Sequence, residues 1–143
     1  MKIKRIPFLS VLVLLVMVLI GCGSDSPIGK TINELAFEKL AGDWSYGTNG
    51  QIILDGQDVS LNYVGFSMSF TDGTYTTTNG GDLFKATGTW TWANETGGSI
   101  NLDTGEEVTI LDLSLTSFKF SFTHTGGPVA AGTSGNYTVS LEK

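Results

Sequence analysis

The single cysteine of this chain, Cys22, is the side chain with the clearest chemical potential, because a thiolate is a strong nucleophile. It follows Gly21 at the end of an apolar run, Phe8 to Ile20, that is broken only by Ser10. Three basic residues precede this run: Lys2, Lys4 and Arg5. A basic start and an apolar core are typical of an export signal. The run is shorter than the roughly 18 to 20 residues that span a bilayer, so we predict that residues 1–21 are a signal peptide and not a transmembrane helix.

The four residues Leu19-Ile20-Gly21-Cys22 resemble the lipobox of bacterial lipoproteins. In that family the cysteine thiol is joined to diacylglycerol, and the chain is then cut before the cysteine. The resemblance implies a lipidated Cys22 and a mature protein that is held to a membrane of the cell envelope by acyl chains, palmitate among them. Two or more buried acyl chains anchor a protein firmly. Gly23 stands where the family's inner-membrane retention signal has aspartate, so the resemblance favours the outer membrane over the inner.

Two other positions suggest catalysis, and we interpret both as structural. Asp103-Thr104-Gly105 has the three letters of an aspartic protease site, in which two such carboxylates share a proton, but only one copy is present. We expect an exposed hairpin turn there, with no second carboxylate to share a proton with Asp103. His124 is the only histidine, and alone it cannot complete a three-ligand zinc site. The sequence therefore predicts no enzyme, no catalytic residue, no metal and no cofactor.

The charge of the chain argues against nucleic acid as a partner. Without the three basic residues of the leader, five lysines face fourteen acidic residues, a formal charge of −9. Nucleic-acid binding and electrostatic attraction to anionic lipid both depend on clusters of lysine and arginine. We therefore expect the attachment to the membrane to depend on the acyl chains alone.

Residues 22–30 have the composition of a tether, the lipidated link between the membrane and the folded domain. They are small and polar and include Pro27, and the eight residues after Cys22 reach at most about 26 Å when fully extended. Thr31-Ile32-Asn33-Glu34 has the pattern of a capping box, which predicts a short helix that begins there and stops before Gly42.

After Gly42 the apolar residues alternate with a period of two, which is the pattern of strands with one buried face. Glycine-containing turns separate these segments, and about eight antiparallel strands result. Closure into an up-and-down barrel hides the strand edges, and a sandwich is the alternative. The fold class predicted for residues 31–143 is therefore all-β, with a short N-terminal helix. Ile110-Leu111-Asp112-Leu113 shifts the apolar phase by one residue, so we expect a bulge or tight turn at Asp112.

Leu40-Ala41-Gly42-Asp43-Trp44 places a Gly-x-Trp motif after the helix and at the start of the first strand. This motif resembles the first signature of lipocalins, and more closely the small lipocalin-like domains of bacterial lipoproteins. Phe70 to Tyr75, Gly88 to Trp90 and Leu113 to Phe122 are similar to later patterns of those domains, so the resemblance covers residues 36 to 143. It implies a small barrel with Trp44 closing its base. The arginine that stacks on this tryptophan in animal lipocalins is absent, since no arginine follows Arg5.

Two functions follow from such a barrel. In the first, a small apolar ligand binds in the barrel and contacts Trp44, Trp90, Trp92 and His124, with a partial cup at the end that carries His124. In the second, aromatic side chains fill the interior, and a structural or interaction lipoprotein presents its loops to an envelope partner. Barrels of eight strands allow either arrangement.

Overall fold

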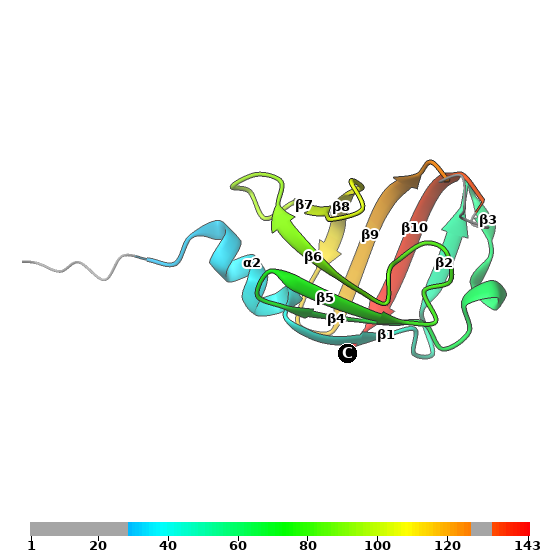
Figure 1. Cartoon of the computed structure of the whole chain (residues 1–143). Coiled ribbons are helices and arrows are strands. Elements are labelled where there is room, and N and C mark those ends of the chain that lie inside the picture. The colour runs from blue at the N-terminus through cyan, green and yellow to red at the C-terminus, as the bar shows by residue number, and fades with distance from the viewer. Residues whose placement is uncertain (1–28, 127–132) are drawn as a thin grey trace, which may run out of the picture.

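The computed structural model describes residues 29–126 and 133–143 of the protein. The predicted signal peptide, Cys22 and most of the tether lie outside these residues. The described chain forms one α-helix, α2 (Ile32–Leu40), and one 3₁₀ turn, η1 (Ser60–Tyr63). Its strands are β1 (Gly42–Ser45), β2 (Gln51–Leu54), β3 (Gln57–Asp58), β4 (Ser67–Thr71), β5 (Thr74–Thr78), β6 (Thr87–Trp92), β7 (Ser99–Leu102), β8 (Glu107–Leu113), β9 (Ser117–His124) and β10 (Gly135–Glu142) (Figure 1).

Helix α2 begins at the predicted capping box. The Glu34 amide donates to the Thr31 hydroxyl at 3.2 Å, and the Thr31 amide donates to the Glu34 carboxylate at 2.6 Å. These two bonds satisfy amides at the helix start that have no partner within the helix. The helix ends at Leu40, and Gly42 follows with φ of +109°, a backbone conformation that favours glycine.

Eight strands close into an antiparallel barrel. Their order is β1-β4-β5-β6-β7-β8-β9-β10, and β10 pairs with β1 through Glu142 and Ser45. Each strand from β4 to β9 pairs with the next strand along the chain, which is the up-and-down topology. β2 continues along β10 and carries the short hairpin strand β3. The predicted fold class is confirmed, and the sandwich is not formed.

Large apolar side chains fill the barrel. The buried set takes alternate positions on the strands and includes the inward row of β9: Phe118, Phe120, Phe122. These rings contact one another, and Phe84 of the β5–β6 connection stacks against Phe66 and packs on Phe122 at 5.0 Å between centroids. The remaining buried apolar residues are Leu40, Trp44, Ile52, Met68, Phe70, Tyr75, Leu83, Trp90, Ile100, Leu102, Val108, Tyr137, Val139 and Leu141.

The predicted bulge lies in β8. Ile110 pairs with Phe120 and Asp112 pairs with Lys119, so Leu111 is the extra residue on the bulged strand. Its side chain is exposed, while Leu113 packs against the core. Because of this one extra residue, the apolar residues that follow Leu111 point into the barrel again.

Candidate functional site

Trp44 closes the base of the barrel and has no surface left for a ligand. Its side chain is 0% exposed, its Nε1 donates to the Leu40 carbonyl at 2.7 Å, and its ring lies 5.4 Å from that of Phe118. The indole N–H is the only polar group of this side chain. The barrel-base interpretation of Trp44 agrees with this geometry, and its inclusion among the ligand-contacting residues does not.

The C-terminal residue, Lys143, lies over Trp44. Its Nζ is 4.3 Å from the ring centroid and donates to the carbonyls of Lys39 and Ala41 at 2.8 and 2.7 Å. These carbonyls lie in the last turn of α2 and at its C-cap, where a helix has unpaired acceptors and negative partial charge. The cation over the tryptophan is therefore a lysine, which the sequence motifs did not predict.

Trp90 and Trp92 lie at the end of the barrel that α2 covers. Trp90 is 4% exposed, and its Nε1 donates to the carbonyls of Thr71 and Thr74 at 3.0 and 3.1 Å. Trp92 stands edge-on to Trp90 at 5.2 Å, and Phe37 of α2 lies 5.9 Å from Trp90. A hollow of about 480 Å³ between α2 and β6 is lined by Asn33, Glu34, Phe37, Asp72, Gly73, Trp90, Thr91 and Trp92. We call it the helix-end hollow, because α2 covers this end of the barrel, and its lining surface is largely apolar.

His124 lies at the opposite end of the barrel, the mouth. It is the last residue of β9, whereas Trp92 is the last residue of β6, three strands away in an antiparallel sheet. The predicted ligand residues thus lie at two different ends of the barrel. Trp44, Trp90, Trp92 and His124 do not form one site.

The His124 imidazole is paired with a carboxylate. Its Nδ1 is 2.7 Å from Glu106 Oε1, and Glu106 Oε2 accepts from the Thr104 hydroxyl at 2.8 Å. Both side chains are largely buried, at 8% and 14% exposed. His124 Nε2 has no hydrogen-bond partner among the described residues. A buried polar atom without a partner costs free energy, so this end of the imidazole is the best candidate at the mouth for a polar contact.

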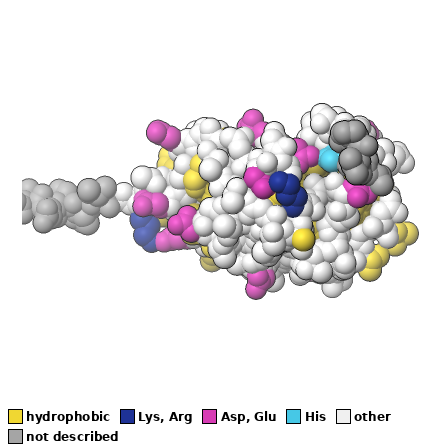
Figure 2. Space-filling view, viewed as in Figure 1, with side chains coloured by type: hydrophobic (Ala, Val, Ile, Leu, Met, Phe, Trp, Pro, Cys, Tyr) yellow, Lys and Arg dark blue, Asp and Glu magenta, His cyan; other side chains and the backbone are white. Residues whose placement is uncertain are grey.

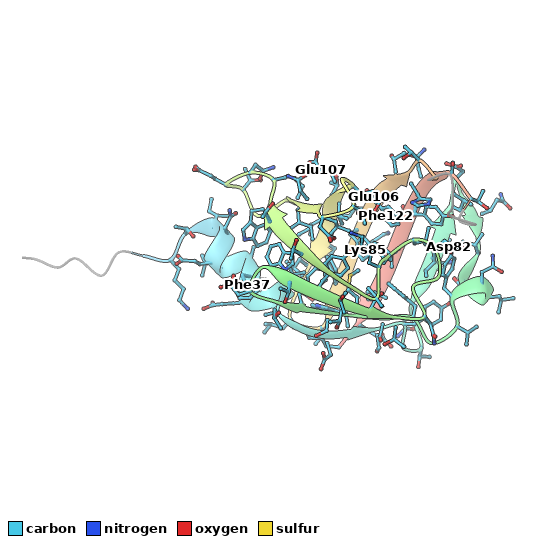
Figure 3. The ribbon with its side chains drawn as sticks, viewed as in Figure 1. Phe37, Asp82, Lys85, Glu106, Glu107 and Phe122 are labelled. Atoms are coloured by element: carbon cyan, nitrogen blue, oxygen red, sulfur yellow. The ribbon has the colours of Figure 1, made fainter. Side chains whose placement is uncertain are left out.

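A cavity of about 620 Å³ opens beside this pair. Leu83 and Phe84 line it with buried apolar side chains, and its polar lining is mainly acidic, with Asp82, Glu106 and Glu107 against Lys85. Thr104, Gly105, Thr123, His124, Thr125 and Gly126 complete the lining. Figure 2 shows histidine, lysine or arginine, and acidic side chains gathered on this face of the domain, and Figure 3 labels the four charged residues of the lining. A cup therefore lies at the His124 end, and its lining is mixed, partly apolar and partly charged.

Asp103 lies in the exposed turn between β7 and β8, as predicted, but its carboxylate has partners on neighbouring elements. Lys85 Nζ donates to Asp103 Oδ2 at 2.9 Å, and the Tyr75 hydroxyl donates to Oδ1 at 3.3 Å. The hydrogen bond from Lys85 is the main reason why the pKa of Asp103 lies below its ordinary value. Burial and the nearby Asp103 carboxylate raise the pKa of Tyr75. Asp103 therefore stabilises the junction between the β5–β6 and β7–β8 connections.

Within residues 29–126 and 133–143, no group of three or more histidine, cysteine or acidic side chains is placed to hold a metal ion. No helix in those same residues is long and apolar enough to span a bilayer. The chain matches no known protein-family model and no curated protein sequence. The class that the geometry defines is thus a closed eight-stranded antiparallel barrel with a packed interior and two dissimilar ends.

Proposed function

We propose that this chain is a lipid-anchored, non-enzymatic protein of the bacterial cell envelope, held to the membrane by diacylglycerol on Cys22. The observation that carries this proposal is the position of Cys22, the only cysteine, directly after a small residue at the end of an apolar leader. An anchor of this kind needs no transmembrane helix, because buried acyl chains supply the affinity at about 0.8 kcal/mol per methylene. The outer membrane is the expected destination.

We further propose that the folded part, residues 31–143, is a lipocalin-like domain. The Gly-x-Trp motif supports this assignment, as do the closed barrel, the tryptophan at its base and the cation of Lys143 over that tryptophan. The packed interior favours the interaction function over a ligand held inside the barrel. Aromatic and aliphatic side chains already occupy the space that such a ligand needs. An envelope partner then binds to surface residues, and the mouth around His124 and Glu106 is the candidate binding surface.

Mass spectrometry of the protein from the membrane fraction tests the anchor. We expect a mature chain that begins at Cys22 and carries diacylglycerol, and a Cys22→Ala variant that keeps its leader and lacks the lipid. Gly23→Ser is a matched control that should be processed like the parent. A mature chain that begins at any other residue, or one without acyl mass, would refute the proposal.

A second candidate function keeps a small apolar ligand but moves it out of the barrel interior. The helix-end hollow of about 480 Å³, with Phe37, Trp90 and Trp92 in its lining, is the observation that favours it. Apolar walls of this kind gain roughly 25 cal/mol for each Å² of surface removed from water. Native mass spectrometry against a panel of lipids tests this function. Trp92→Ala should weaken any binding seen, and a panel without a bound species contradicts this candidate.

A further inference from the structure

The described chain enters the barrel at the end that α2 covers, and not at the mouth. Helix α2 lies across this end, where Asn33 Nδ2 donates to the carbonyl of Asn94 after β6. Lys143 joins α2 to the β8–β9 turn, because its Nζ donates to the Lys39 carbonyl and its backbone N–H donates to the Thr116 carbonyl. Figure 1 shows that the described part of the chain begins at this same end, just before α2. We call α2 with the β6–β7 and β8–β9 turns the helix end.

The helix end carries exposed apolar side chains. Ile32 and Leu35 of α2 are 60% and 48% exposed, and Leu115 of the β8–β9 turn is 69% exposed. Leu111 is also exposed, on β8, the strand that α2 contacts. Scattered exposed leucines need no explanation, but several at one end of a small domain mark a contact surface. The other two large exposed apolar residues among those described, Leu61 and Val64, belong to or follow η1, away from α2.

The length of the tether decides which end lies near a membrane. The eight residues from Gly23 to Lys30 span at most about 26 Å when fully extended. Strand β9, which runs from the helix end to the mouth, has eight residues and is itself about 26 Å long. The mouth reaches the bilayer only if the tether is fully stretched along the barrel. Such a conformation has a high cost in entropy, so the helix end is the end that meets the membrane.

From these observations we infer that the helix end is a docking surface for the lipid bilayer, with Ile32, Leu35 and Leu115 in the interfacial layer. The inference rests on the proposed lipid anchor at Cys22. Charge contributes little, because Lys30 and Lys39 are balanced by Glu34 and Glu38 on and beside α2, and the Lys143 ammonium is bound to carbonyls. Apolar contact thus supplies the docking, while the mouth with His124 and Glu106 faces away from the membrane.

The two ends can be compared with matched cysteine variants. Cys22 is the only cysteine, and its thiol is blocked once it is lipidated, so an added cysteine is the only free thiol in the mature protein. Leu35→Cys and Leu115→Cys report on the helix end, and Leu61→Cys is the control away from it. All three positions are exposed, so the fold should tolerate the changes. Each purified lipidated variant is labelled with a fluorescent maleimide and placed in phosphatidylcholine vesicles that contain doxyl-labelled phosphatidylcholine.

We expect the doxyl lipid to quench the labels at Leu35 and Leu115 at least about threefold more strongly than the label at Leu61, because only a side chain in the interfacial layer meets the quencher. Equal quenching at the three positions, or stronger quenching at Leu61, overturns the docking surface. Mass spectrometry of the same samples separates the two proposals. Acylated protein with unquenched helix-end labels overturns the docking surface alone, and protein without acyl mass overturns both.

Discussion

Replacing Lys143 should destabilise the barrel, although this residue is exposed and lies at the end of the chain. In the structure its ammonium makes three contacts: the face of Trp44 at 4.3 Å and the carbonyls of Lys39 and Ala41. A cation over an aromatic ring at an exposed site contributes about 0.5–1 kcal/mol, and a cation at a helix C-terminus contributes about 0.3–1 kcal/mol. Ordering a lysine side chain opposes these gains by up to about 1.5–2 kcal/mol, and the two hydrogen bonds to carbonyls offset that cost.

The net effect expected for Lys143→Met is a loss of about 1 kcal/mol in the free energy of unfolding, equivalent to a melting temperature lower by roughly 4 °C. Denaturant unfolding of a soluble form that begins at Lys30, followed by tryptophan fluorescence, measures this loss. Lys119→Met is the matched control, because it removes the same charge from an exposed position on β9. Lys143→Arg should retain most of the stability. If Lys143→Met and Lys119→Met unfold at the same denaturant concentration, the ammonium does not hold the helix to the barrel base.

Three further predictions follow from the same structure. Trp44→Ala should cost about 3–5 kcal/mol, because it leaves a cavity at a fully buried site; an unchanged denaturant midpoint would contradict its role at the base. Glu106→Ala should cost about 1–3 kcal/mol, since it leaves His124 without its partner, and the exposed neighbour Glu107→Ala is the control. Asp103→Asn should reduce stability at neutral pH. Because the folded pKa of Asp103 lies below its ordinary value of 3.8, the parent's advantage is complete above that value and shrinks as the pH falls below it; an advantage that persists unchanged in acid would contradict this account.

The sequence predicted the elements whose signals are local. The capping box at Thr31, the alternation along β9 and β10 and the phase shift that marks the bulge in β8 all depend on residues that are neighbours in the chain. Strand β5 was not predicted, because four of its five residues are threonine and only Tyr75 is apolar. Tyr75 pairs with Gly88 of β6, where a Cβ atom would come within 2.5 Å of the tyrosine ring. A glycine opposite an aromatic residue is a signal for such a pair, but it is readable only once the two strands are aligned.

The candidate site was predicted less well than the fold, and for a physical reason. Alternation tells which face of a strand a residue occupies, but not which end of the barrel the residue reaches. Trp92 and His124 both point inward by this rule, yet they lie at opposite ends because β6 and β9 run in opposite directions. Grouping the two residues in one ligand site required the strand order, which periodicity does not contain.

The contacts that define each end join residues far apart in the chain. Lys143 lies over Trp44, and Asp103 binds Lys85. For Asp103, the acidic residues that follow it in the sequence favoured an exposed turn, which is formed, but the lysine that binds its carboxylate comes from a different connection between strands. Because the interior between these ends is packed with side chains, a partner at the mouth meets only the residues of that end. His124 and Glu106 can therefore be substituted to test binding without altering the contacts of Trp44 at the base, and the unfolding measurements above verify that separation.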